Sequence, residues 1–168
     1  MLNHKHYLVL AFVLLSSLSI CAQSTSDVVF VEDLKSEARV QLKRIIADYD
    51  LDDWVFTNTV QVAHGVDAHS KPILTMNTDH LNDDKLQLSV FIHENAHWFV
   101  ADDSKDKAEN AAIAELNLLF PDAPEPNQRN LYHHIMVAWV TFDALVELFG
   151  KEEARAIFER NINFHLQG

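Results

Sequence analysis

Cysteine is almost absent from this chain: Cys21 is its one thiol among 168 residues. A lone cysteine excludes an internal disulfide framework, and it excludes the cysteine-rich zinc sites. The fold must then be stabilised by a hydrophobic core, for which the apolar fraction of 48% is sufficient. Any metal site must be built from histidine, aspartate and glutamate, and the chain has 10 histidines.

Basic residues are also scarce. The chain has 13 Lys and Arg residues against 25 Asp and Glu residues, which gives a formal net charge of −12, and the basic residues form no cluster. Binding to nucleic acid, or to an anionic membrane surface, needs clustered positive charge. We therefore expect no nucleic acid partner and no electrostatic attachment to a membrane surface.

A long apolar run occurs near the N-terminus. Residues 7–15 read YLVLAFVLL, follow Lys5 and precede the small and polar residues SSLSICAQ. This pattern is typical of a signal peptide, and the run is too short to span a membrane. We expect residues 1–22 to be removed after Ala22 and the protein to be exported, periplasmic or extracellular, without an integral membrane segment. Lipid attachment at Cys21 is the alternative.

Repeats and low-complexity tracts are missing too, so residues 23–168 are expected to form a single domain. Apolar spacing and turn residues indicate several helices and two strands. The predicted helices cover residues 32–49, 84–101, a segment between Ser104 and Pro121, 128–149 and 151–163. The predicted strands, 54–63 and 71–78, are expected to pair as an antiparallel hairpin. The predicted fold class is α+β, with a small antiparallel sheet packed against about five helices.

The segment VFIHENAHWFV contains His93-Glu94-Asn95-Ala96-His97, which reads H-E-x-x-H. Residues four apart on a helix project from the same face, so His93 and His97 can reach one metal ion. Glu94 projects to the side of this pair, where it can reach a water on the metal rather than join the ligand shell. The pattern therefore predicts a Zn2+ site with Glu94 as the general base.

The alternative is a pair of histidines packed in a core helix. On a helical wheel both histidines share a stripe with Leu86, Val90 and Val100, so both point toward the core. Two buried imidazoles and a carboxylate are costly without partners, and a metal ion would satisfy them together. This argument favours the metal site over the packed pair.

A catalytic zinc site normally has three protein ligands and one open position. The candidates for the third ligand are Glu109 and Glu115 on the following helix, and His133 or His134 on the long helix. The apolar stripe of the long helix is formed by Leu131, Ile135, Ala138, Phe142, Leu145 and Phe149. His134 lies on the core-facing side of this stripe and His133 on the far side, which favours His134, with Glu115 next.

HENAH resembles the active-site helix of the zincin metallopeptidases. Together with HSKPILTMNT, AIAEL and LYHHIMVAW, it looks like a small family of uncharacterised bacterial zincin-like proteins. The resemblance implies a zincin-like fold, a strand along the cleft at KPILTMNT, and a third histidine ligand at His134. The chain lacks the glycine-containing extension of metzincins, since Val100 stands where that glycine would be.

These features predict a secreted zinc hydrolase, a metallopeptidase acting on peptide or other amide bonds. Its ligands would be His93, His97 and His134, and either Tyr132 or His133 would stabilise the oxyanion. The alternative is a non-catalytic zincin-like domain that binds metal or a partner. Three further histidines flank the predicted strands: His64, His69 and His80. We expect them to be turn or rim residues, and the alternative is that one of them lines a cleft or binds a second metal.

Overall fold

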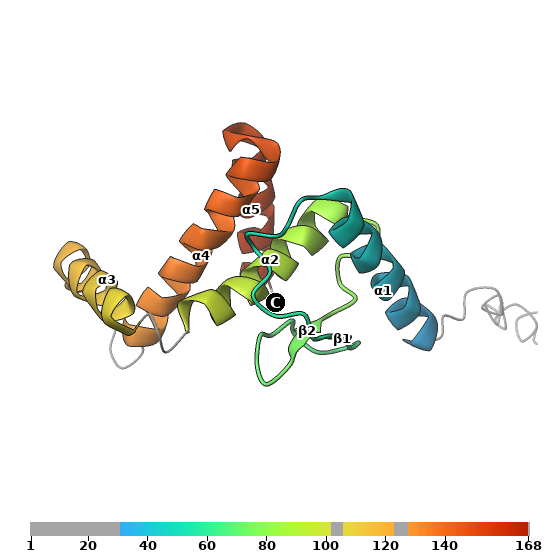
Figure 1. The fold of residues 1–168 in the computed structure, drawn as a ribbon, viewed down its shortest axis with the longest axis horizontal. Coiled ribbons are helices and arrows are strands. Elements are labelled where there is room, and N and C mark those ends of the chain that lie inside the picture. Colours follow the sequence, from blue (N-terminus) through green and yellow to red (C-terminus); the bar gives the residue numbers. More distant parts are fainter. Residues whose placement is uncertain (1–30, 102–105, 123–127, 168) are drawn as a thin grey trace, which may run out of the picture. The chain divides into compact units, whose positions relative to one another are not determined.

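The computed structural model describes residues 31–101, 106–122 and 128–167. The predicted signal peptide, the alternative lipid site at Cys21 and the predicted helix start at Ser104 lie outside these residues. Five helices and a two-stranded sheet lie within them (Figure 1). In chain order they are α1 (Val31–Asp48), β1 (Val60–Val62), β2 (Leu74–Met76), α2 (Asp84–Val100), α3 (Asp106–Leu119), α4 (Gln128–Phe149) and α5 (Lys151–Gln167). The α+β class is confirmed, and the predicted bounds of α4 match.

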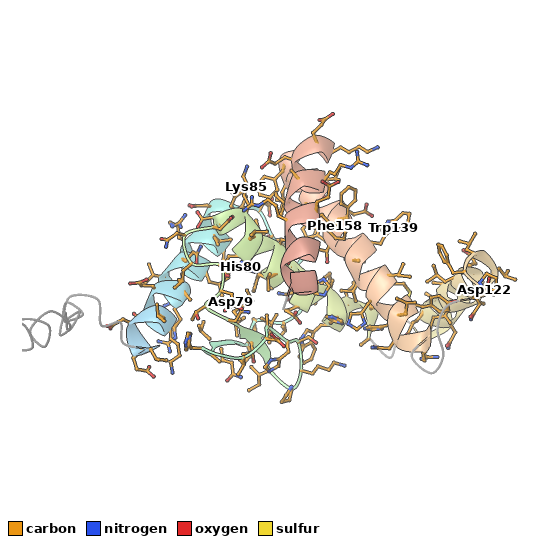
Figure 2. All side chains as sticks on the ribbon, turned by 180° about the vertical axis from the view of Figure 1, so that it is seen from behind. Asp79, His80, Lys85, Asp122, Trp139 and Phe158 are labelled. Atoms are coloured by element: carbon orange, nitrogen blue, oxygen red, sulfur yellow. The ribbon has the colours of Figure 1, made fainter. Side chains whose placement is uncertain are left out.

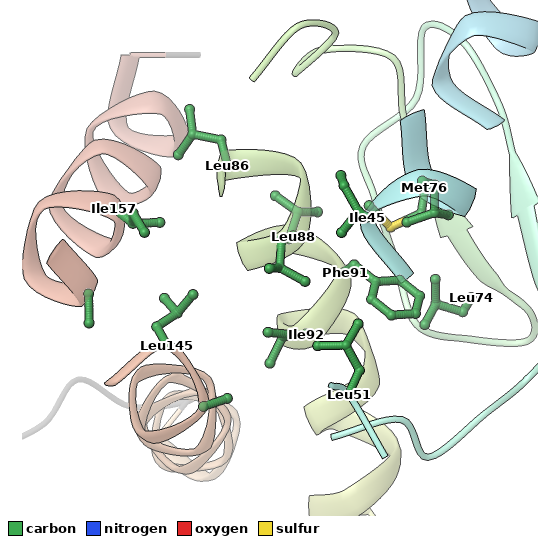
Figure 3. Packing of buried hydrophobic residues seen from close by; sticks show 14 residues of the cluster. Ile45, Leu51, Leu74, Met76, Leu86, Leu88, Phe91, Ile92, Leu145 and Ile157 are labelled. Carbon is green, nitrogen blue, oxygen red and sulfur yellow. The ribbon is translucent and has the colours of Figure 1, made fainter. Parts of the chain in front are cut away.

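Helix α2 is the centre of the packing, since it contacts α1, α4, α5 and β2. Its N-terminus is capped by Asp83, whose carboxylate accepts a hydrogen bond from the Leu86 N–H at 3.1 Å. Figure 3 shows Phe91 pointing toward Leu74 of β2, while Leu86 lies on the side of Ile157 in α5. Because α2 is covered on several sides, polar side chains within it need specific partners.

The two strands run parallel, so the predicted antiparallel hairpin is wrong. Both strands are also shorter than predicted, and Val60 is in register with Leu74. The reason is a double reversal of the connecting chain. His69 forms an antiparallel bridge with Thr75, after a turn in which Gly65 has a positive φ of 72°. The chain therefore turns once before His69 and once after it, and β2 leaves in the direction of β1.

Helix α4 does not bury the whole of its predicted apolar stripe. Its fully buried residues are Tyr132, Val137, Thr141, Ala144 and Leu145. Leu131, at the start of the predicted stripe, is 39% exposed. The first half of α4 lies between α2 and α3 and so has two apolar sides, which a single stripe does not describe. Gly150, with a φ of 78°, ends α4 as predicted.

None of the described helices is long and apolar enough to cross a membrane. The sheet and α1 cover one side of α2, and α4 and α5 cover another (Figure 3). The C-terminal half of α2, which carries the H-E-x-x-H motif, continues along the first half of α4. The functional residues are therefore expected where these two helices meet, beside the segment that connects β1 to β2.

Candidate metal centre

The H-E-x-x-H motif lies in the second half of α2, as predicted. His93 and His97 are half-buried, and their ring centroids are 5.1 Å apart. Glu94 is 7% exposed although it carries a carboxylate. A buried carboxylate beside two imidazoles is uncommon in a helix that packs in the core. The combination indicates a functional site rather than ordinary core packing.

Helix α4 brings two more histidines to this point. The ring centroid of His97 lies 5.3 Å from that of His133 and 5.1 Å from that of His134. Two imidazoles bound through nitrogen to one tetrahedral zinc would have their centroids about 5.2 Å apart, given Zn–N distances of about 2.0–2.1 Å. The spacing of the rings around His97 therefore suits ligands of a common ion.

Hydrogen bonds orient several of these rings. The Nδ1 of His134 lies 2.8 Å from the Asn130 carbonyl, so this nitrogen carries the proton and Nε2 keeps a free lone pair. The Nδ1 of His93 lies 3.5 Å from the Thr141 hydroxyl, whose own proton is donated to Val137. Such contacts fix the ring and its tautomer in metal sites, because they leave the opposite nitrogen available as a ligand.

His133 is held differently. Its Nδ1 lies 3.6 Å from the Glu109 carboxylate, and its Nε2 lies 3.2 Å from the Nδ1 of His97. It is also less exposed than His134, contrary to the prediction that it would lie on the far side of the helix. The turn of α4 that follows Tyr132 therefore places both histidines near His97. Which of the two is the better candidate for the third metal ligand depends on their contacts and not on the apolar stripe.

The histidines of this cluster are suitable ligands for zinc, but their nitrogens are not arranged as a complete coordination shell. Among the described residues, no three histidine, cysteine or acidic side chains converge as ligands of one ion. The Nδ1 of His97 faces the ring of His133. It does not point toward a position that His93 and His134 could also reach. The backbone positions already bring the rings within ligand spacing, so rotation of side chains is the change that metal binding would require.

The pKa values of two of these histidines are shifted. Burial first, and then the neighbouring His93, His134 and His133, lower the pKa of His97 to about 3. The pKa of His133 is lowered as well, mainly by burial, while Glu109 opposes the change. Both shifts favour the neutral imidazole of His97 and of His133, and the neutral form is the one that ligates metals.

Burial acts in the opposite direction on the carboxylate, because it disfavours the charged form of each group. It raises the pKa of Glu94 to about 7, and the nearby charge of His69 opposes the rise. A general base works best with a pKa near the operating pH. The raised pKa of Glu94 is in the range that suits a general base.

A pocket of about 310 Å³ opens beside the motif, and His93, Glu94 and His134 line it. Further lining residues come from the β1–β2 connection, from the segment after β2, and from α4 and α5. They include Asp79 and His80, which are labelled with Phe158 in Figure 2. The pocket is at the lower end of the size range of small-molecule sites, and Glu94 forms part of its wall.

Two residues near the motif have contacts that the sequence did not predict. Asn95, inside the motif, is fully buried, and its Oδ1 accepts hydrogen bonds from the N–H groups of Phe56 and Thr57 at 3.0 and 3.2 Å. His69, predicted as a turn or rim residue, lies close enough to Glu94 to act on its pKa. The feature of the sequence that points to a special role for Asn95 is its position as a polar residue within an apolar helix.

Two other predicted candidates lie elsewhere. Glu115 is exposed and lines a separate groove with Leu116 and Trp139. The hydroxyl of Tyr132, a candidate for the oxyanion, donates a hydrogen bond to the Phe120 carbonyl at 2.8 Å. Tyr132 thus ties α4 to the end of α3.

Comparison with known proteins found no relative: no family model matches the chain, and no curated protein or solved structure is significantly similar to it. The resemblance to zincins therefore depends on the motif and on the sequence segments around it. The assignment of a function depends on the geometry of His93, Glu94, His97 and the α4 histidines.

Proposed function

We propose that this protein is an exported zinc-dependent hydrolase that cleaves amide bonds in peptides, with a zincin-like arrangement around α2. The observation that carries the proposal is the buried Glu94, which lines a pocket together with His93 and His134. His97 lies at ligand spacing from both of these histidines. We assign His93, His97 and His134 as the residues that would hold zinc.

In the proposed reaction, zinc and Glu94 have different roles. When bound, zinc would lower the pKa of a water molecule and polarise the carbonyl of the substrate. Glu94 accepts the proton of the attacking water at its carboxylate and passes it to the nitrogen of the leaving amine. With a pKa raised to about 7, Glu94 is basic enough for the first transfer and acidic enough for the second.

Of the two residues predicted to stabilise the developing negative charge, Tyr132 is engaged elsewhere, because its hydroxyl donates a hydrogen bond to the Phe120 carbonyl. His133 is the one that lies at the motif, since its Nε2 is 3.2 Å from the Nδ1 of His97. We therefore keep His133 as the candidate for this role.

The decisive experiment uses the mature chain and its Glu94→Gln variant. We expect one zinc per chain in both proteins, measured by atomic absorption, because Glu94 is not a ligand. We expect the variant to lose more than about 100-fold in kcat on a fluorogenic peptide mixture, since general acid–base catalysis contributes that much. Glu147→Gln, on the exposed side of α4, is the matched control and should keep full activity. Protein that binds no zinc, or a Glu94 variant that turns over normally, would refute the proposal.

A second candidate function is a closed, non-catalytic metal site. The observation that favours it is the fourth histidine: the Nε2 of His133 lies 3.2 Å from the Nδ1 of His97. Two nitrogens on one tetrahedral zinc would be about 3.3 Å apart, so four histidines could fill the shell. X-ray absorption separates the two candidates, because the enzyme predicts three imidazoles with one water oxygen and the closed site predicts four imidazoles.

A further inference from the structure

The pocket beside Glu94 combines apolar walls with acidic groups at its mouth. Its apolar lining residues are Ala68, Val90, Ala138 and Phe158. Asp67 and Asp79 also line it, and both are exposed, so they mark the side that opens to solvent. Among the described residues that line the pocket there is no lysine or arginine.

The two carboxylates have no cationic partner in the part of the chain that the structure describes. Asp79 accepts one hydrogen bond, from the Nδ2 of Asn77 at 2.6 Å, which holds the carboxylate in place without neutralising it. Asp67 lines the same pocket, so the lining at its exposed side carries two negative charges. Such a mouth attracts a cation, and the net charge of −12 adds to the attraction.

Asn161 of α5 provides an independent observation. It lines the same pocket and is 8% exposed. Its Nδ2 donates a hydrogen bond to the Ser89 hydroxyl at 3.2 Å, but its buried Oδ1 has no donor among the described residues. A buried acceptor without a donor is unfavourable, and a ligand N–H in the pocket would supply the missing hydrogen bond.

We propose that this pocket binds a lysine or arginine side chain of the substrate. The alkyl stem would lie along Phe158 and Val90, and the cation would reach the carboxylates of Asp67 and Asp79, as long basic side chains do when the stem is buried and the charge is wet. An N–H of the bound residue satisfies Asn161. The inference rests on the proposed function, because it gives the substrate class of that hydrolase: peptides with a basic residue beside the cleaved bond.

The first test measures binding and does not depend on turnover. The probes are Nα-acetyl-lysinamide and Nα-acetyl-norleucinamide, titrated into the zinc-loaded mature chain and followed by NMR. We expect the lysine probe to bind at least about 10-fold more tightly, with shifts at Ala138, Phe158 and Asn161, since the two probes differ in the terminal charge. Equal affinities would overturn the proposal.

Substitution of the mouth residues provides the second test. Asp79→Asn keeps an acceptor for Asn77 and removes one charge, and it should weaken binding of the lysine probe about 3-fold, while the double change with Asp67→Asn should remove most of the preference. Asp122→Asn is the matched control, because Asp122 is an exposed aspartate that lines a different groove and lies well away from Asp79 (Figure 2). Unchanged binding in the double variant would overturn the proposal.

A pair of peptides that differ by lysine against norleucine separates the two proposals. Hydrolysis of both peptides at the same kcat/KM, with no selective binding of the lysine probe, would refute the subsite and leave the hydrolase standing. Selective binding that Asp67→Asn and Asp79→Asn abolish, without hydrolysis of either peptide, would support the subsite and refute the hydrolase. A preference of about 10-fold in both binding and kcat/KM is the expected result.

Discussion

His133 and His134 are neighbours in the chain, yet their surroundings assign them different roles. His134 lines the pocket with Glu94 and has its Nδ1 occupied by a backbone carbonyl. His133 lies between His97 and the Glu109 carboxylate. We expect His134→Ala to weaken zinc binding by more than about 100-fold and His133→Ala by about 10-fold, because loss of a ligand costs more than loss of a group that orients one.

Competition with a chromophoric zinc chelator measures both affinities under the same conditions. His64→Ala is the control, since His64 is an exposed histidine whose Nδ1 contacts the Thr78 hydroxyl. The reverse order of effects would make His133 the ligand and His134 a pocket residue. Equal and large losses from both substitutions would favour the closed site with four histidines.

Asn95 couples the motif to the chain before β1. Its Oδ1 accepts two backbone N–H groups, from Phe56 and Thr57, and its Nδ2 donates to the Phe91 carbonyl at 3.0 Å. Asn95→Ala removes the acceptor of the Phe56 and Thr57 N–H groups, and we expect it to lower the free energy of unfolding by about 2–3 kcal/mol. Urea denaturation measures the change. The control Asn58→Ala, at an exposed position of the same segment, should change stability by less than about 0.5 kcal/mol.

The sequence was informative at the residue scale where the signal is local. The H-E-x-x-H spacing within one helix placed His93, Glu94 and His97 on α2, and the structure has them there. The contacts of Asn95 with Phe56, and the position of His69 near Glu94, join segments far apart in the chain. No periodicity within a helix can reveal such contacts, because they depend on how the loops fold back.

At the scale of elements, α1 and α2 are joined by an ion pair whose effect depends on pH. Arg44 donates two hydrogen bonds to the Asp84 carboxylate, at 2.5 and 2.7 Å, and these lower the pKa of Asp84. A lowered pKa in the folded state stabilises the fold above the pKa of the unfolded chain, and this contribution is lost as the pH falls through the folded-state value.

We therefore expect Arg44→Gln to lower the midpoint of urea unfolding at pH 7. The difference from the parent protein should begin to shrink below about pH 4, where aspartate of the unfolded chain takes up its proton, and should vanish at lower pH. Arg155→Gln is the control, because Arg155 pairs with Glu159 within α5 and joins no two elements. A difference that stays constant down to acid unfolding would show that the pair with Asp84 is not its cause.

The predictions for helices and strands were correct where packing on one side sets the sequence pattern of an element, and wrong where packing on two sides sets it. The predicted bounds of α4 hold because Gly150 adopts the positive φ that ends a helix. Its rotation was misjudged because the first half has apolar neighbours on both α2 and α3. The direction of β2 was misjudged because the sequence shows that the chain turns near Gly65, but not that it turns again after His69.

At the scale of the whole molecule, the proposed metal site would connect α2 and α4, which pack against each other and against the other helices. Helix α2 contacts four other elements, and α4 carries α3 and α5. Ligands on both helices make zinc binding part of the folding free energy, because the unfolded chain does not hold the ligands together. Zinc should therefore stabilise the folded domain as a whole rather than one loop of it.

We expect zinc at 100 times its dissociation constant to add about 2.7 kcal/mol to the free energy of unfolding, which corresponds to a rise in Tm of about 8 °C for a domain of this size. Differential scanning calorimetry of the mature chain, with zinc and with a chelator, measures the shift. The variant His93→Ala with His97→Ala should show none of it, while His64→Ala should show all of it. Calcium should have no effect, because imidazole nitrogen is a poor ligand for that ion. A zinc-induced rise that persists in the double variant would locate the stabilising metal away from the H-E-x-x-H helix, and the metal centre assigned to α2 and α4 would then be wrong.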